Sequence, residues 1–232
     1  MATIEEVKTY YDTVHLKTVK KVGINKRHLT ILKNLKKVGL QANSKVLEIG
    51  CGIGTVSQLI LKHIPQGKLV GLDISPESIE LAKQYNKSYT HAEFLVNDMS
   101  NFTHSLQFDF VVFPDVLEHI PVDQHAHIFE TIAKLTSPNA VVLINIPEPN
   151  HLNWLRKNHP DKLQIIDQSL SMQDLLNHAY PYGFKLYSMN SYSLFYAVHD
   201  YVSIVLKKNM ELREAPLKPY LSRAIDALRS KF

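Results

Sequence analysis

Short apolar runs alternate with amphipathic stretches along the central part of the chain. The runs are three to six residues long and rich in β-branched side chains, as buried strands are. They cover residues 46–49, 69–72, 94–96, 110–113 and 141–146, and helical spacing appears between them at residues 55–64, 76–86 and 123–135. This alternation predicts an α/β fold in which crossover helices connect the strands of a parallel sheet.

The two ends of the chain extend this pattern. Residues 4–20 and 25–38 have apolar positions at helical spacing, with Gly39 as a stop signal, and they predict an N-terminal helical lid over residues 1–40. At the other end, residues 217–232 predict a C-terminal helix within the segment 210–232.

A polar segment interrupts the alternation after the fifth apolar run. Residues 148–168 contain prolines, histidines and aromatic side chains, which predicts a loop or cap, and Ser171 then caps a helix to about residue 179, so that a cap insertion covers about residues 148–182. Residues 184–189 and 201–207 predict an antiparallel C-terminal strand pair. The expected core, residues 41–209, is therefore a three-layer Rossmann-like sheet that is mostly parallel.

Composition indicates an ordinary globular chain. With 232 residues, of which 45% are hydrophobic and 21% are charged, one large domain is expected and disorder is excluded. The single cysteine, Cys51, excludes an intramolecular disulfide and a thiolate zinc cluster, so we expect a cytoplasmic protein. No run approaches the roughly 18 apolar residues that a membrane span needs, and no membrane partner is expected.

The net charge is +4, and part of the surplus is concentrated near the N-terminus. The basic residues there are Lys17, Lys20, Lys21, Lys26, Arg27, Lys33, Lys36 and Lys37. Such a face can attract a phosphorylated substrate or RNA. Solvated lysines on amphipathic helices are the commoner explanation of this pattern.

A glycine-rich turn follows the first predicted strand. Gly50, Gly52 and Gly54 alternate with other residues after Glu48, and they allow a sharp turn and a close approach of the backbone to a ligand. The helix that begins near Thr55 directs free N–H groups toward that ligand. The spacing differs from the G-x-G-x-x-G of dinucleotide-binding proteins.

Acidic residues end the next two predicted strands. Asp73 lies about 20 residues beyond the glycines, where a carboxylate can accept hydrogen bonds from ribose hydroxyls. Asp98, within Asn97-Asp98-Met99, could accept from an adenine amino group. Each acid could instead stabilise a turn, but all these groups end strands at the edge where open parallel sheets bind ligands.

Together, these segments resemble the class I S-adenosylmethionine-dependent methyltransferases. The resemblance rests on residues 46–54, 71–73, 97–98, 108–112 and 117–120, and it extends over roughly residues 30–207. It implies that Glu48 and the glycines bind the methionine part of S-adenosylmethionine, Asp73 the ribose and Asp98 the adenine. Tyr11 resembles a lid residue that covers the cofactor. The full implied cofactor set is Tyr11, Glu48, Gly50, Cys51, Gly52, Gly54, Asp73, Ile74, Asn97, Asp98, Met99 and Pro114.

One further cluster bears on the chemistry. If a helix follows Pro114, then Asp115, Glu118 and His119 share one face at positions i, i+3 and i+4 and can bind Mg²⁺ or Mn²⁺. The cluster is similar to the E-x-x-E-H motif of ubiquinone-pathway O-methyltransferases and of small-RNA 3′-terminal 2′-O-methyltransferases, with Asp115 in place of the first glutamate. Without metal, His119 and Asp115 are the candidate catalytic residues, with His119 as base, or His119 simply packs.

The expected reaction is therefore O-methylation of a small hydroxylated metabolite. Trp154, Tyr180, Tyr182, Tyr192 and Tyr196 are candidates to line the acceptor pocket. The alternative acceptor is the 2′-hydroxyl of an RNA terminus, and the alternative of another class is a non-catalytic nucleotide-binding protein of the same fold. The choice between monomer and homodimer is left open.

Overall fold

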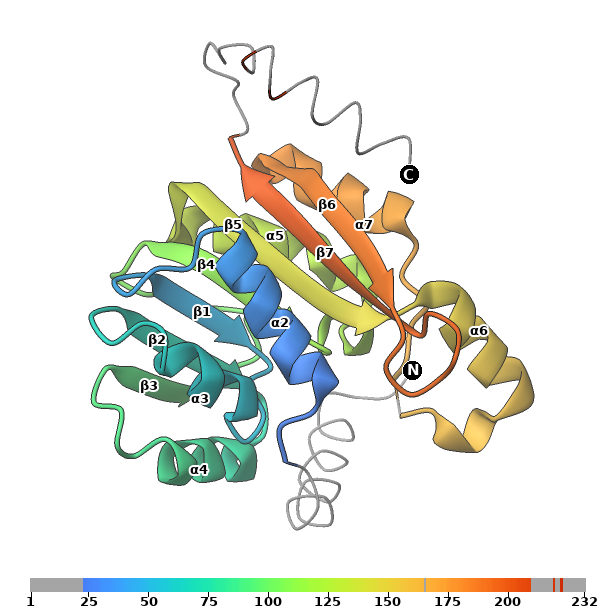
Figure 1. Ribbon diagram of the computed structural model, residues 1–232, viewed down its shortest axis with the longest axis horizontal. Helices are drawn as coiled ribbons and strands as arrows, with labels where there is room; N and C mark the ends of the chain where they lie inside the picture. Colours follow the sequence, from blue (N-terminus) through green and yellow to red (C-terminus); the bar gives the residue numbers. More distant parts are fainter. Residues whose placement is uncertain (1–22, 165, 210–218, 220–221, 223–232) are drawn as a thin grey trace.

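A seven-stranded sheet forms the centre of the molecule, with strand order β3-β2-β1-β4-β5-β7-β6 (Figure 1). The computed structural model describes residues 23–164, 166–209, 219 and 222. The strands are β1 (Lys45–Ile49), β2 (Lys68–Asp73), β3 (Ala92–Val96), β4 (Phe108–Pro114), β5 (Thr136–Pro147), β6 (Phe184–Tyr192) and β7 (Tyr201–Lys208). The first five are parallel, and β7 runs antiparallel to both β5 and β6, as the sequence predicts.

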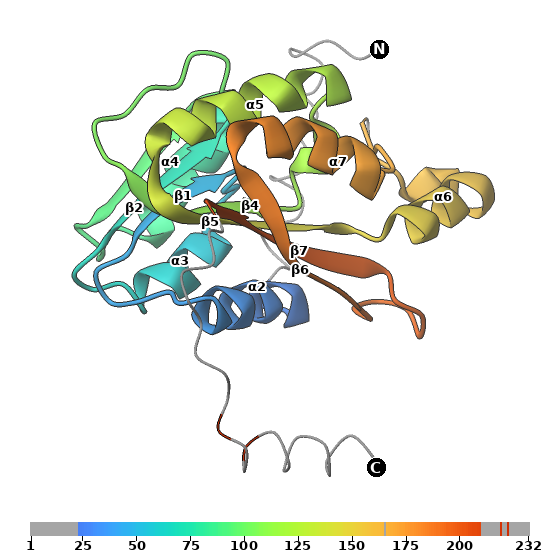
Figure 2. The same cartoon turned by 90° about the horizontal axis from the view of Figure 1, so that it is seen from above.

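Helices cover both faces of the sheet. They are α2 (Lys26–Lys37), α3 (Thr55–Leu61), α4 (Pro76–Tyr85), α5 (Val122–Leu135), α6 (Pro149–Asn158) and α7 (Met172–Ala179), with short 3₁₀ turns η1 (Leu117–His119), η2 (Pro160–Lys162) and η3 (Tyr180–Tyr182). Figure 2 shows α2 and α3 on the face opposite α5 and α7. The predicted three-layer Rossmann-like fold is thus confirmed.

Two apolar cores result from this layering. Successive strand residues point to opposite faces, so Val46 of β1 packs with Ile31 of α2 on one face, whereas Leu47 packs in the core that includes Phe129 of α5 on the other. Parallel strands covered on both faces are expected to be apolar throughout, which is why the sequence shows short continuous runs.

The first predicted helix, residues 4–20, and the predicted C-terminal helix, residues 217–232, lie outside the described residues. Residues 26–37 of the expected lid form α2, which is fixed to the sheet by the buried side chains of Ile31 and Leu35. The segment predicted as a loop or cap contains α6, which lies beyond the end of β5 (Figure 1). Within the described part of the chain, no helix is both long and apolar enough to cross a membrane.

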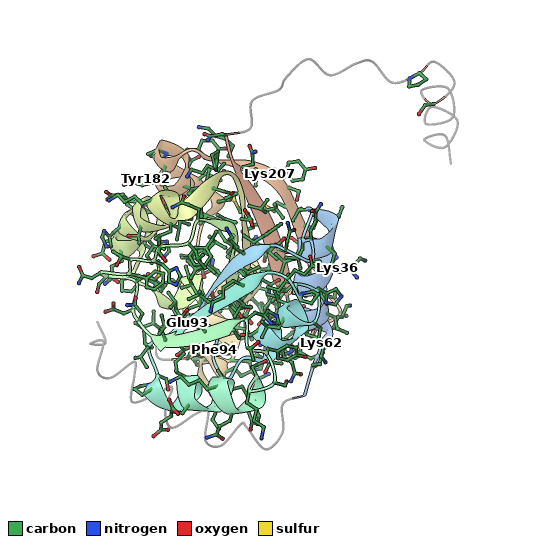
Figure 3. All side chains as sticks on the ribbon, turned by 90° about the vertical axis from the view of Figure 1, so that its left-hand side faces the viewer. Lys36, Lys62, Glu93, Phe94, Tyr182 and Lys207 are labelled. Carbon is green, nitrogen blue, oxygen red and sulfur yellow. The ribbon has the colours of Figure 1, made fainter. Side chains whose placement is uncertain are left out.

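Most lysines near α2 project into solvent. Lys36 and Lys62 are exposed on the surface formed by α2 and the end of α3, and Figure 3 shows them there, away from Tyr182 on the opposite face. Lys26, Lys33 and Lys37 are also exposed. Arg27, in contrast, turns toward the end of the sheet, where it becomes part of a buried charge cluster.

Candidate functional site

The carboxyl end of β1 forms the predicted glycine turn. Gly50, Gly52 and Gly54 have φ values of 74°, 51° and 80°, which residues other than glycine rarely adopt. A Cβ atom on Gly50 would lie 2.6 Å from the side chain of Val116. The N–H groups of Gly50 and Cys51 both donate to the Leu72 carbonyl, at 2.8 and 2.9 Å. The shape of the turn is thus set by its backbone hydrogen bonds to β2 and by the close approach of Val116, in the segment after β4.

Glu48 lies beneath this turn with one oxygen unsatisfied. Its side chain is fully buried, Ser57 Oγ donates to Oε2 at 2.6 Å, and Oε1 has no hydrogen-bond partner in the part of the chain that the structure describes. Burial raises the pKa of Glu48 to about 8. The hydrogen bond from Ser57 lowers this pKa, and the charge of Asp73 raises it further. A buried acid with an open acceptor atom suits a ligand that brings a donor such as an ammonium group.

Asp73 connects the end of β2 to the glycine turn. Its carboxylate accepts from the N–H of Gly52 at 2.8 Å and from the N–H of Ser75 at 3.0 Å, and Ile74 between them is half-buried. The structural role that the sequence left open is therefore observed. Its predicted contact with ribose stays a prediction.

The end of β3 is a tight turn. Asn97 Oδ1 accepts from the N–H of Met99 at 2.7 Å, and Met99 is buried with a φ of 69°. The exposed Asp98 carboxylate accepts from Ser100 N–H and Oγ at 2.9 and 2.6 Å, and these bonds lower its pKa. Tyr11, the predicted lid residue, lies outside the described residues.

A cavity of about 290 Å³ lies beyond the end of β4. Its lining residues are Arg27, Asp115, Glu118, His119, Pro147, His151, Leu152, Leu155, Lys162, Leu163, Gln164, Asp167, Phe195, Tyr196, Asp200 and Tyr201. Val116, which crowds Gly50, directly follows Asp115 in this lining. The cavity and the glycine turn are therefore neighbours at the carboxyl edge of the sheet, where ligands bind in folds of this kind.

A hydrogen-bonded network holds Asp115 at one wall of the cavity. Arg27 forms an ion pair with Asp115 Oδ2, Asn145 Nδ2 donates to Oδ1 at 3.1 Å, and the Tyr192 hydroxyl donates to Asn145 Oδ1 at 2.9 Å. Arg27 also donates to the Tyr201 hydroxyl at 3.4 Å. Burial raises the pKa of Asp115, although Arg27 and Asn145 act in the other direction. The Asp115 carboxylate is thus already paired with the guanidinium group of Arg27.

The helix after Pro114 that would place Asp115, Glu118 and His119 on one face does not form. Asp115 takes a left-handed φ of 57° directly after Pro114, the last residue of β4, and only the short turn η1 follows. Asp115, Glu118 and His119 still line one cavity, but Arg27 stands against Asp115, and Asp167 Oδ1 lies 3.2 Å from His119 Nδ1. Among the residues that the structure describes, no group of three side chains is arranged to hold a metal ion. The expected Mg²⁺ or Mn²⁺ is therefore not supported.

The charge state of the cluster argues against His119 as a base. Burial lowers the pKa of His119, but the charge of Glu118 and the bonds to Asp167 and the Ile166 carbonyl outweigh it and raise the pKa to about 9. Burial also raises the pKa of Glu118 to about 8, with His119 opposing this shift. The direction of this shift favours the protonated ring, which cannot take a proton from an acceptor.

Several cavity residues have no clear signal in the sequence. Arg27 belongs to a run of otherwise exposed basic residues, and only its distant partner Asp115 distinguishes it. His151 and Lys162 come from α6 and η2. Of the five aromatic candidates for the pocket, only Tyr196 lines the cavity. Trp154 stacks on the outer side of His151, with ring centroids 5.7 Å apart.

Comparisons with known proteins identify related methyltransferases. Residues 46–139, which contain the glycine turn and the Asp115 cluster, match the family model of the methyltransferase domain. Malonyl-[acyl-carrier protein] O-methyltransferase 1 of Ilyobacter polytropus is 37% identical over 73 residues, which are 32% of this chain and 27% of that enzyme. Trans-aconitate 2-methyltransferase of Acidovorax ebreus is 23% identical over 210 residues, covering 85% of this chain and 78% of that enzyme.

Solved structures show the same fold. The magnesium protoporphyrin IX methyltransferase of Synechocystis, with bound S-adenosylhomocysteine, superposes with a TM-score of 0.71 at 17% identity, over 89% of this chain and 100% of that chain. The N-methyltransferase NodS of Bradyrhizobium japonicum, in complex with S-adenosylhomocysteine, gives 0.63 at 19% identity, over 79% and 86%. Residues 46–139 thus match a methyltransferase domain, and the methyltransferase relatives support an S-adenosylmethionine-dependent enzyme of this type. S-adenosylmethionine is accordingly the cofactor that these findings support.

Proposed function

We propose that this chain transfers the methyl group of S-adenosylmethionine to an oxygen atom of a small polar acceptor bound in the cavity. The observation that carries the proposal is the contact between the two sites. Val116 lies against Gly50 of the glycine turn, and its chain neighbour Asp115 lines the cavity. A methyl group presented at the turn would face an acceptor in the cavity.

The residues at the glycine turn fit the cofactor. Gly50 leaves a space that a Cβ atom would fill, and Glu48 Oε1 is a buried acceptor without a partner. Glu48 and the turn backbone of Gly50, Cys51, Gly52 and Gly54 would hold the methionine part, Asp73 and Ile74 the ribose, and Asn97, Asp98 and Met99 the adenine, with Pro114 beside the turn. Tyr11 would cover the bound cofactor.

S-adenosylmethionine supplies a sulfonium methyl group that an oxygen lone pair can displace. This chain needs to hold the acceptor oxygen in line with that methyl group and to keep water away. Leu152, Leu155 and Leu163 supply apolar wall to the cavity, and Lys162, which forms no ion pair with a carboxylate in the described ranges, supplies positive charge. The names of the two relatives, which point to acyl-carrier-bound malonate and to trans-aconitate, support an acidic acceptor.

The size of the cavity favours a metabolite over an RNA terminus. A volume of about 290 Å³ lies at the lower end of the range for small-molecule sites, roughly 300 to 1,000 Å³. The exposed lysines of α2 keep RNA as the second candidate acceptor. Steep salt dependence of RNA binding, together with methyl transfer to the 3′ end, would favour that candidate.

Calorimetry tests the cofactor part of the proposal. S-adenosylhomocysteine should bind the purified protein and NAD(H) should not, and Asp73→Ala should weaken the binding. Labelled methyl transfer to small acids, hydroxy compounds and short RNAs then tests the reaction. Cofactor binding without transfer to any acceptor would support the non-catalytic alternative instead.

A further inference from the structure

Two buried polar side chains face the cavity without hydrogen-bond partners. Glu118 is 1% exposed and His151 is 8% exposed, and both line the cavity. Among the described residues, neither oxygen of Glu118 has a hydrogen-bond partner, since His119 Nε2 stays 3.7 Å from Oε1, and Nε2 of His151 has none either. Leaving such groups unsatisfied is unfavourable, and a ligand with matching groups removes that cost.

The wall beside His151 contains a cation without an acidic partner. The ring of Tyr196 packs 4.4 Å from that of His151, and Lys162 Nζ donates to the Tyr196 hydroxyl at 3.2 Å. Arg27, the other long cation of the cavity, is paired with Asp115, whereas Lys162 forms no ion pair with any carboxylate in the described ranges. Lys162 is therefore the cation best suited to bind an anionic ligand group.

The two ends of the cavity differ in their distance from the glycine turn. Glu118 follows Val116, which lies against Gly50, by only two residues. His151 and Lys162 come from α6 and η2, beyond the end of β5 (Figure 1). The reacting group of an acceptor would thus lie near Glu118, and its other end would lie near His151 and Lys162.

We propose that the acceptor is a small hydroxycarboxylic acid, whose hydroxyl donates to Glu118 and whose carboxylate binds Lys162 and His151 Nε2–H. This assignment rests on the proposed methyl transfer. Ionised Glu118, the form that prevails above its raised pKa of about 8, offers only acceptor oxygens, which suits a hydroxyl donor. In the reaction, the hydroxyl oxygen bonds to the methyl carbon as the carbon–sulfur bond breaks. The bonding pair stays on sulfur, and the hydroxyl proton leaves along the hydrogen bond to Glu118.

The product distinguishes this proposal from methylation of a carboxylate. Transfer to the hydroxyl gives an ether that survives mild alkali, whereas transfer to a carboxylate gives an ester that alkali cleaves. The test uses lactate, malate, mandelate and 3-hydroxybutyrate as acceptors, with the matched deoxy acids and the methyl esters of the hydroxy acids as controls. Labelled methyl transfer and alkali treatment of the product are measured.

We expect an alkali-stable product from at least one hydroxy acid. The kcat/KM for this hydroxy acid should exceed the kcat/KM for its deoxy acid and for its methyl ester by about tenfold or more, because each control compound leaves a buried polar group unpaired. An alkali-labile product, equal use of the matched compounds, or no binding of any hydroxy acid to the protein saturated with S-adenosylhomocysteine would each overturn the proposal. Failure of S-adenosylhomocysteine to bind at all would instead overturn the proposed function.

Variants test the assignment of residues. Glu118→Gln keeps the shape, His151→Phe keeps the ring that packs on Tyr196, and Lys162→Met keeps the apolar stem. Lys162→Met should raise KM about tenfold with little change in kcat, as expected when a ground-state contact is removed. Lys157→Met, at an exposed α6 position outside the cavity, is the matched control. Equal KM values for Lys162→Met and Lys157→Met would contradict the role of Lys162, while unchanged S-adenosylhomocysteine affinity shows that each variant is folded.

Discussion

Arg27 in the first turn of α2 forms an ion pair with Asp115, the residue that directly follows β4. The pair connects a helix on one face of the sheet to the wall of the acceptor cavity. The side chain of Asp115 is 10% exposed and that of Arg27 is 26% exposed, so the pair is largely removed from water. Helix α2 is therefore part of the site as well as part of the core.

Loss of Arg27 should destabilise the fold. Arg27→Met leaves the buried Asp115 without its cation, and we expect the free energy of unfolding to fall by about 2 to 3 kcal/mol in denaturant titrations. The double variant Arg27→Met/Asp115→Asn removes the unpaired charge as well and should recover part of that loss. Lys26→Met, an exposed neighbour, is the control. Additive losses in the double variant would show that the two side chains do not interact.

Gly50 should tolerate alanine less well than Gly39. Both have positive φ values, 74° and 107°, but a Cβ atom at Gly50 would meet Val116 at 2.6 Å, whereas nothing lies within 4 Å of one at Gly39. Gly39→Ala therefore measures backbone strain alone, about 1 to 3 kcal/mol. Gly50→Ala should add a steric cost and weaken S-adenosylhomocysteine binding.

Calorimetry and denaturant unfolding of the two glycine variants check this comparison. Gly50→Ala/Val116→Ala should recover part of the stability, because it removes the β-branched side chain that causes the clash. Equal stability and equal ligand affinity of Gly50→Ala and Gly39→Ala would contradict the proposed close approach at Gly50.

Binding of S-adenosylhomocysteine should strengthen as the pH rises from 6.5 to 8.5. Burial raises the pKa of Glu48 to about 8, so the free protein holds a proton there at neutral pH. If the ligand ammonium binds to ionised Glu48, as proposed, this proton must leave, and affinity should increase about tenfold or more over that range.

Calorimetry at the two pH values measures this change. Glu48→Gln cannot release that proton, so its affinity should be weaker and less dependent on pH. Ser57→Ala, which removes the hydrogen bond to Glu48 Oε2, should shift the dependence to higher pH. A pH dependence that is the same in Glu48→Gln and in the wild type would exclude Glu48 as its source.

The sequence predicts those features that depend on local patterns. The central parallel strands are recognisable because both of their faces are covered, so each becomes a short apolar run. The glycine turn is recognisable because positive φ values favour glycine at Gly50, Gly52 and Gly54. Asp73 is recognisable because its role depends on its place at a strand end. Its observed hydrogen bonds stabilise the turn, which is the alternative role that the sequence allows beside ribose binding.

The acceptor site depends on contacts between distant segments, which no local pattern shows. Arg27 resembles its exposed lysine neighbours until the fold brings it to Asp115. The spacing of Asp115, Glu118 and His119 suits a helix, yet Asp115 adopts a left-handed φ of 57° and the helix does not form. Aspartate enters this conformation more readily than most residues, so the sequence contains no strong signal against it or for it.

His119 should stabilise the fold in a pH-dependent way. Burial alone would lower its pKa, but Glu118 and Asp167 raise it to about 9 in the folded protein, above the ordinary value of 6.5. A group whose pKa rises on folding makes its full contribution to the stability of the fold at pH values below its pKa in the unfolded chain. This contribution is lost as the pH rises through its pKa in the folded protein. The stability difference between wild type and His119→Gln should therefore be largest near pH 6 and shrink by about 3 kcal/mol by pH 9.5.

Denaturant unfolding at pH 6, 7.5 and 9.5 measures that difference. Asp167→Asn removes one of the acids that raise the pKa of His119, and the decline should then begin at lower pH. His127→Gln, an exposed histidine outside the cluster, shows the effect of removing a histidine elsewhere in the chain. A difference between wild type and His119→Gln that grows from pH 6 to pH 9.5 would mean that His119 is neutral in the folded protein. That result would restore His119 as a candidate base, because only the neutral ring can take a proton from an acceptor hydroxyl.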